Sequence, residues 1–296
     1  MTLKGIKLRI YPSKEQQTSI KLNFGYNRFV WNQMLDMLQE RYKNNPNLPF
    51  PSAFTLNNLL PTMKLEYPWL KDAESKSLQI TCKNLVDAYK AFFKLHKGFP
   101  KFKSKKYPKQ SYQTNYTIKL NDSKVKFPKL GYINFKGSSK KLEEIVSIKT
   151  GTIKLTPTGK YYLVLIAECE SQALPKSGKQ VGIDMGLADL MITSDGTKYP
   201  TIRFDKILAK KKHYWEKRLS RRRLQAQETL AWDKHNKVLD PRELKDFKNY
   251  HKAKLMVAKY SEKIANQRSN YLHLLTRQLV EQYDTIKIED LKTKNL

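Results

Sequence analysis

The chain has 296 residues, with 57 Lys and Arg against 27 Asp and Glu, so its net charge at pH 7 is +30. This length allows two domains with separate cores and excludes one small module. So large a cationic excess repels itself in a compact fold, and its usual use is to bind nucleic-acid phosphates. No stretch approaches the roughly 20 apolar residues of a membrane span, and the start lacks a signal-peptide core. Composition therefore predicts a cytosolic protein that binds nucleic acid and no membrane.

The two cysteines, Cys82 and Cys169, lie far apart and have no metal-ligand partners at short spacing. Neither a disulfide framework nor a zinc ribbon can be built from them. The histidines form no ligand cluster. We therefore expect no zinc, and no cofactor that binding requires.

Residues 3–10 alternate apolar with basic or small residues, which is the period of a half-buried strand. Ser13 then resembles an N-cap with Gln16 at the third helical position, and apolar residues follow at helical spacing. A second amphipathic helix is predicted over about 74–95. Asn27, Arg28 and Asn32 lie in the first helix, where burial and RNA contact are equally compatible with the pattern.

After residue 100 the pattern changes to short extended pieces separated by Pro, Gly, Asn and Asp. These pieces are 117–120, 124–127, 132–135, 147–155 and 161–169. We interpret them as a small, mostly antiparallel β-barrel that strand 3–10 joins. The first domain is then 1–11 and 97–175, with a helical lobe at 12–96 inserted.

Turn-forming residues at 171–179 indicate a linker, and a second domain is predicted over 180–296. It opens with a pair of strands, continues with helices at 207–224 and 241–282, and returns to a β-branched strand near 285–291. The helical insertion spans about 207–282. The predicted fold class is therefore α+β with more than one domain.

Two acidic residues interrupt or end apolar strands of this domain, Asp184 and Glu289. An ionised carboxylate there is costly unless it binds a metal or hydrogen-bond donors, and adjacent strands could bring the pair together as a two-metal nuclease requires. The alternative is that Asp184 caps a turn while Glu289 merely ends a strand. Two-metal hydrolysis needs about three carboxylates or more, and only 296 − 289 = 7 residues follow Glu289. Asp189 and Asp195 are conceivable substitutes, although turn or surface positions suit them better.

Two basic segments are predicted to bind nucleic acid, although a solvated helix face is the usual alternative for such a run. The first is a helical run with interleaved Tyr214 and Trp215, and the second mixes lysines with short polar groups that can contact base edges. The candidates in the first segment are Lys210, Lys211, Arg218, Arg221, Arg222 and Arg223. The candidates in the second are Lys103, Lys105, Lys106, Lys109, Ser111, Tyr112, Thr114 and Asn115.

Two motifs carry a family resemblance: the segment Gly182 to Gly186 (GIDMG) and the segment Ile288 to Leu291 (IEDL). They resemble the first and second RuvC motifs of TnpB-type RNA-guided proteins, and blocks around residues 7–16, 24–32, 98–103 and 262–268 resemble family blocks in the same order. The resemblance implies a β-barrel wedge domain with an inserted helical recognition lobe, followed by an RNase H-like RuvC domain with a helical insertion. It also implies that Lys76 and Gln79, with Thr114 and Asn115, read a short motif beside the DNA target.

Family members continue into a four-cysteine zinc ribbon and a third RuvC motif, neither of which this sequence contains. The chain therefore most resembles the truncated, nuclease-dead TnpB-like repressors, with Asp184 and Glu289 left over or holding Mg²⁺ weakly. We expect a non-enzymatic monomer in a ribonucleoprotein that binds a guide RNA and double-stranded target DNA and represses transcription by occupancy. The alternatives are an RNA-guided endonuclease whose missing acid comes from Asp189, Asp195 or a partner chain, and a transposon-associated DNA-binding accessory protein.

Overall fold

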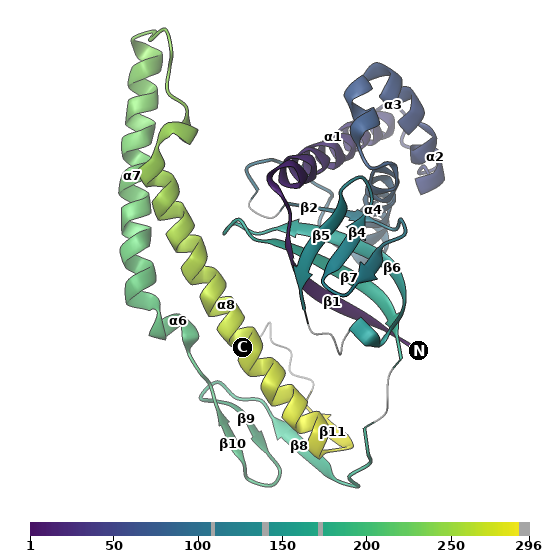
Figure 1. The fold of residues 1–296 in the computed structure, drawn as a ribbon, viewed down its shortest axis with the longest axis vertical. Helices are drawn as coiled ribbons and strands as arrows, with labels where there is room; N and C mark the ends of the chain where they lie inside the picture. The colour runs from purple at the N-terminus through teal and green to yellow at the C-terminus, as the bar shows by residue number, and fades with distance from the viewer. Residues whose placement is uncertain (108–109, 138–141, 171–173, 290–296) are drawn as a thin grey trace. The chain divides into compact units, whose positions relative to one another are not determined.

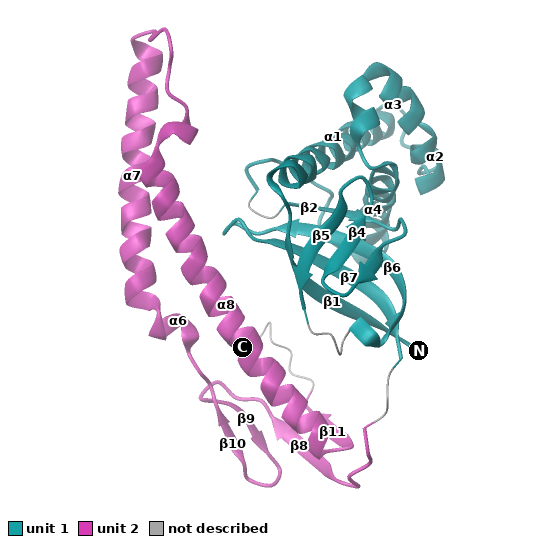
Figure 2. Ribbon diagram, in the orientation of Figure 1, with its two compact units in different colours: residues 1–171 teal, residues 172–296 magenta. Residues whose placement is uncertain are grey.

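The structure is a computed structural model that describes residues 1–107, 110–137, 142–170 and 174–289. The chain divides into two compact units, Met1–Ser171 and Gln172–Leu296 (Figure 2). Within the described residues, no helix combines the length and the apolar content that a bilayer crossing requires.

A seven-stranded sheet forms the centre of the first unit (Figure 1). Its strands are β1 (Thr2–Tyr11), β2 (Gln110–Thr114), β3 (Lys119–Asn121), β4 (Lys124–Phe127), β5 (Gly131–Lys136), β6 (Ile145–Leu155) and β7 (Tyr161–Cys169). Their order is β2-β6-β7-β1-β5-β4-β3, and every neighbouring pair is antiparallel. The predicted first strand is confirmed, and its alternation buries Ile6, Leu8 and Ile10 in the core.

The sheet curls until strands far apart in its order touch. The rings of Tyr112 on β2 and Phe127 on β4 are 5.9 Å apart, although four strands separate β2 from β4. A methyl group added to Gly151 on β6 would meet the side chain of Ile118 and lie 3.2 Å from the Phe127 ring. The predicted barrel is thus only partly correct: β2 and β3 remain the two unpaired edges of the described sheet, so the strands form a curled half-barrel.

Helices α1 (Lys14–Asn44), α2 (Ala53–Asn58), α3 (Leu60–Glu66) and α4 (Ser75–Leu95) and the 3-10 turn η1 (Pro68–Asp72) lie between β1 and β2 in the chain. The predicted capping box of α1 is present, with Ser13 and Gln16 each bonding the other's backbone N–H. The Gln16 side-chain amide also donates to the carbonyls of Leu130 and Tyr132. The start of α1 is therefore fixed to the sheet.

Polar side chains join α1 to α4 inside the helical core. The Asn27 amide donates to Ser77 Oγ and its oxygen accepts from the Thr81 hydroxyl, at 3.0 and 2.6 Å. Asn27 is buried. Of the two possibilities that the sequence left open for this residue, the structure shows the buried and satisfied one.

The second unit is a four-stranded sheet with a long helical hairpin. The strands are β8 (Gln180–Asp184), β9 (Asp189–Thr193), β10 (Lys198–Pro200) and β11 (Thr285–Ile288), in the order β10-β9-β8-β11. The helices are α6 (Phe204–Ile207), α7 (Ala209–His235) and α8 (Lys248–Gln282), and the 3-10 turn η2 is Leu244–Asp246. Leu275 and Leu279 of α8 pack on one face of the sheet.

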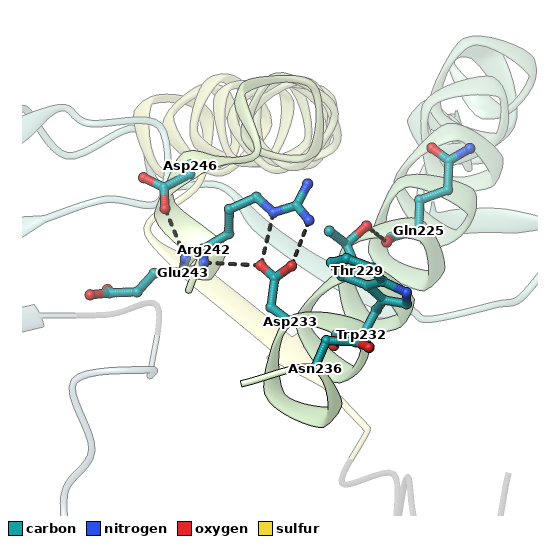
Figure 3. A network of polar contacts seen from close by, with 8 residues as sticks. All are labelled: Gln225, Thr229, Trp232, Asp233, Asn236, Arg242, Glu243 and Asp246. Carbon is teal, nitrogen blue, oxygen red and sulfur yellow. Dashed lines mark hydrogen bonds and ion pairs between the residues drawn. The ribbon is translucent and has the colours of Figure 1, made fainter. Parts of the chain in front are cut away.

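An ion pair between the end of α7 and the loop that follows it lies at the tip of the hairpin (Figure 3). The Asp233 carboxylate, near the end of α7, accepts from the Arg242 guanidinium at 2.6 and 2.8 Å and from the Arg242 backbone N–H at 3.0 Å. The Asp233 side chain is 2% exposed. Its hydrogen bonds to Arg242 hold the pKa of this carboxyl below its usual range.

Replacing Gly151 by Ala tests the curl of the first sheet. We expect the free energy of unfolding to fall by roughly 1–3 kcal/mol, because the added methyl group overfills the core between Ile118 and Phe127. Gly98→Ala is the matched control, since nothing lies within 4 Å of its added Cβ. Urea unfolding followed by circular dichroism measures both. Equal stability of the two variants would contradict the contact between β6 and β4.

Arg242→Ala tests the hairpin tip. Removing the half-exposed Arg242 leaves the buried Asp233 carboxylate without its charged partner, so amide exchange at the end of α7 should accelerate by about tenfold or more. Lys245→Ala, which breaks only the exposed pair with Glu243, is the control. The pKa of Asp233 is lower in the folded state than its unfolded value of about 3.9. In the wild-type protein, the stability that the ion pair contributes, and with it the protection of amides at the end of α7, should therefore be present above a pH of about 3.9 and be lost as the pH falls further. Hydrogen exchange measured by mass spectrometry gives both results.

Candidate carboxylate centre and nucleic-acid interface

The parallel pairing of β8 and β11 places Asp184 and Glu289 at one edge of the sheet. Ile288 pairs with Ile183, and Ile286 pairs with Val181. Asp184 ends β8 and Glu289 directly follows β11, so they are the next pair in this register. Neighbouring strands are about 4.8 Å apart, which brings the two backbones within reach of one shared ion.

Alternation along the strands puts both carboxylates on the same face. Val181, Ile183 and Ile286 belong to the cluster beneath α8. Asp184 lies one position after Ile183 and Glu289 lies three positions after Ile286, so alternation turns both to the other side, and both are exposed. Two neighbouring carboxylates repel each other unless a cation lies between them, and oxygen ligands of this kind are what Mg²⁺ prefers.

Asp195 belongs to the opposite end of the sheet. Ser194 donates to the carbonyl of Gly182, so Asp195 lies beside the first half of β8, away from Asp184. Its carboxylate accepts from the hydroxyls of Thr193 and Tyr283, which hold its pKa well below the usual range. This placement argues against Asp195 as the substitute third acid.

Asp189 lies at the same end of the sheet as Asp184, because only the loop 185–188 separates β8 from β9. Its backbone pairs with Pro200. Among the described residues, however, no group of three or more His, Cys, Asp or Glu side chains lies close enough to hold a metal ion. The centre that the described residues define is therefore a pair of carboxylates.

The predicted basic helix is α7, whose cations face solvent. Only Ala226 and Asp233 are buried along its 27 residues. All six predicted candidates in it are exposed: Lys210, Lys211, Arg218, Arg221, Arg222 and Arg223. The Arg218 guanidinium lies over the rings of Tyr214 and Trp215, at 5.1 and 5.6 Å from their centres.

A shallow depression of about 380 Å³ lies beside these rings, and the sequence did not indicate that Tyr260 of α8 would line it. Lys210, Lys211, Tyr214 and Trp215 form the rest of its lining. Cations next to aromatic rings are the usual combination in sites for single-stranded nucleic acid. Packing of α8 against α7 brings Tyr260 here, and spacing along the chain cannot show which helix faces meet.

The second predicted segment is divided between surface and core. Lys103, Lys105, Lys106, Ser111 and Asn115 are exposed, as is Lys76 on α4, while Gln79 is half-buried. Tyr112 and Thr114 are buried, because they are the inward-facing residues of β2. Lys109 lies outside the described residues. The exposed candidates can therefore contact nucleic acid at the surface, whereas Tyr112 and Thr114 contribute to the core.

Side chains of α1 hold the segment before β2 in place. The Trp31 indole N–H donates to the carbonyl of Lys101, and the Asn32 amide exchanges two hydrogen bonds with the backbone of Lys103. The Lys103 ammonium lies 3.6 Å from the centre of the Trp31 ring. Arg28 donates to the Gln110 side chain at 3.1 Å. The backbone that carries Lys101 and Lys103 is therefore anchored to α1.

Comparison with known proteins identifies a transposase-related chain. Residues 162–296 match the OrfB_IS605 family model, described as "Probable transposase", and residues 1–46 match HTH_OrfB_IS605, described as "Helix-turn-helix domain". The chain belongs to the TnpB/OrfB_IS605 family, as its motifs predicted. Within residues 1–46 the structure shows the strand β1 and the single long helix α1 in place of a helix-turn-helix.

Two relatives carry the name "Putative RNA-guided DNA endonuclease". InsQ of Escherichia coli (strain K12) is 29% identical over 300 residues, which cover 99% of this chain and 67% of InsQ. The relative from Streptomyces pristinaespiralis is 26% identical, over 99% of this chain and 68% of its own. A solved Cas12f1–sgRNA–target DNA complex has 12% identity and a TM-score of 0.38, covering 99% of this chain and 82% of that one, a likeness too distant to carry an argument.

The expectation that the protein is not an enzyme is wrong. Both relatives are named as endonucleases, and the family model describes a transposase. The expectation rested on a count of carboxylates, yet Mg²⁺ is commonly held by one or two carboxylates together with the phosphate oxygens of its substrate. These matches give no support to placement among nuclease-dead repressors.

Replacing Arg221, Arg222 and Arg223 together by Ala tests the interface on α7. Nucleic-acid affinity should fall, and the slope of log K against log salt should decrease by about 1 for each phosphate that the variant no longer binds. Lys119, Lys124 and Lys126 replaced together by Ala remove the same charge from the other unit and serve as the control. Filter binding at several salt concentrations measures both slopes. An unchanged slope in the arginine variant would exclude these residues from the interface.

Proposed function

We propose that the protein is an RNA-guided DNA endonuclease whose metal-binding residues are Asp184 and Glu289. The observation that carries the proposal is the β8–β11 register, which puts the two carboxylates at one edge and on one face of the sheet. Membership of the TnpB/OrfB_IS605 family and the names of two relatives support it. The reaction would be hydrolysis of a DNA phosphodiester by water.

The partners in this proposal are a guide RNA and a double-stranded DNA target. Base pairing selects the target, while the protein supplies positive charge for two phosphate backbones and contacts beside the target. The net charge of +30 and the exposed cations of α7 suit that role. We propose a monomer in the ribonucleoprotein, with Lys76, Gln79 and Asn115 as residues that contact the flanking DNA.

Mg²⁺ fits the donor set at the proposed centre. Asp184 and Glu289 offer carboxylate oxygens from neighbouring strands, and exposure of both leaves room for water and for a DNA phosphate. A bound cation would polarise the phosphate and lower the pKa of a coordinated water. The protein's part is to hold two acids at a fixed spacing on a rigid sheet edge.

Occupancy of the target is a necessary step before cleavage. A target that overlaps a promoter would therefore be shielded from transcription for as long as the complex remains bound. We propose repression of this kind as a consequence of binding, in addition to cutting.

Asp184→Ala and Glu289→Ala, made separately, test the proposal. Each should reduce Mg²⁺-dependent cleavage of a matched target by about a hundredfold or more, because the metal supplies several kcal/mol of transition-state stabilisation. Target binding should be unchanged, since neither residue contributes charge that attracts phosphate. Asp36→Ala, at an exposed position of α1, is the control. Cleavage that survives both substitutions would refute the assigned centre.

The guide itself is identified by sequencing RNA that co-purifies with the protein expressed with its native flanking DNA. One discrete RNA that ends in a variable segment is the expected result. Specific DNA binding that persists after RNase treatment would instead favour an accessory protein that reads DNA without RNA.

A further inference from the structure

A cavity of about 590 Å³ lies within the first unit, between α1, α4, the segment 101–107, β2 and β6. This volume is within the range of about 300–1,000 Å³ typical of pockets that enclose small molecules. We call it the α1–β2 cavity. It is lined in part by residues that the candidate interface did not include, among them Arg28, Asn84 and Gln113.

The cavity walls combine three kinds of side chain. Arg28, Lys101 and Lys103 supply positive charge, and none of the described lining residues is acidic. Asn84 and Gln113 supply amides that make no hydrogen bond within the described residues. Phe102 and Tyr107 supply rings that are 53% and 59% exposed, so both have faces free for stacking.

The three cations have no carboxylate partner among the described residues. Arg28 donates to a neutral amide oxygen of Gln110, and the Lys103 ammonium lies over the Trp31 ring. Burial lowers the pKa of the Lys103 ammonium to about 8, so it remains mostly charged at pH 7, and all three cations can attract a bound anion. Hydrogen bonds between the side chains of Trp31 and Asn32 and the backbone of residues 101 and 103 hold this wall in place, which lowers the entropy cost of binding.

We propose that the α1–β2 cavity receives one unpaired nucleotide of a nucleic-acid strand. The base stacks on Phe102 or Tyr107, the free amides of Asn84 and Gln113 bond its edge, and Lys101 and Lys103 bind the flanking phosphates. The inference deepens the proposed function and rests on it for the presence of a nucleic-acid partner. Both RNA and DNA supply this chemistry.

An intact duplex does not suit the same cavity. Its bases are stacked and paired, so it offers only phosphates to a concave surface, and free amides and rings would remain unused. An unstacked base can present its face and its edge together. The combination of concavity, amides and aromatic rings therefore favours an unpaired nucleotide.

Ser111→Trp tests the proposal by filling the cavity from β2, where Ser111 is exposed and lines the wall. The control is the same substitution at Ser123, an exposed residue in the turn between β3 and β4 that does not line the cavity. The full chain is titrated with labelled single-stranded RNA, with single-stranded DNA of the same sequence, and with the DNA duplex. The single strands carry 2-aminopurine, whose fluorescence is quenched when it stacks on a ring.

Ser111→Trp should weaken binding of a single strand by about tenfold and abolish the quenching, while duplex affinity and the Ser123→Trp variant stay at wild-type values. A stronger effect on RNA assigns the nucleotide to the guide, and a stronger effect on DNA assigns it to the target. The double variant Asn84→Ala, Gln113→Ala should also weaken single-strand binding. It replaces Ser111→Trp in the test if that variant fails to fold.

Equal single-strand binding and quenching in Ser111→Trp and Ser123→Trp would overturn the proposal. So would a parallel loss of duplex binding, which would indicate phosphate contact alone. Guided cleavage of DNA is scored separately in the wild-type protein. If Ser111→Trp weakens single-strand binding but the wild-type protein does not cleave DNA, the proposed endonuclease activity is refuted and the proposed nucleotide site is retained. If the protein cleaves DNA but Ser111→Trp has no effect, only the proposed nucleotide site is refuted.

Discussion

The parallel pairing of β8 with β11 is the contact on which the carboxylate centre depends. Parallel neighbours require a long crossover connection, and in this chain β9, β10 and the helical hairpin make that connection. The returning helix α8 also covers one face of the sheet through Leu275 and Leu279. One helix thereby brings β11 into position and leaves the carboxylate face uncovered by its own packing.

Helix α7 contributes few residues to the hydrophobic core, which explains how it carries so much charge. Only Ala226 and Asp233 are buried in it, so most of its positions are available to Lys and Arg. It is stabilised by packing against α8, by the ion pair between Lys212 and Glu216, and by the pair of Asp233 and Arg242 at the tip. In α4 the opposite holds, because eight of its residues are buried and pack against α1 and the sheet.

Local signals predicted much of the fold. The alternation at 3–10 and the capping box at Ser13 depend on neighbours in the chain, and both are confirmed. The strands 124–127 and 161–169 were predicted with the bounds that the structure shows. Strand β2 was not predicted as a strand, because Gln110–Thr114 is polar and reads as a contact segment.

The remaining features depend on contacts between distant segments. Closure of the barrel is set by how tightly Tyr112 and Phe127 approach, and no spacing along the chain encodes that distance. The same holds for Asn27, whose partners lie on α4, and for the α1–β2 cavity, whose walls come from five segments. The candidate carboxylates were found from sequence because each interrupts an apolar strand. Their shared face required the register of β8 and β11.

The crossover that separates β8 from β11 also sets a delay during synthesis. Asp184 is synthesised 289 − 184 = 105 residues before Glu289, which at about 5–20 residues per second is an interval of roughly 5–20 seconds. During that interval β8 has β9 as a neighbour but no parallel strand beside it. The carboxylate pair is therefore complete only after the cationic hairpin has been synthesised, so the candidate nucleic-acid interface is present in the nascent chain before the candidate metal centre.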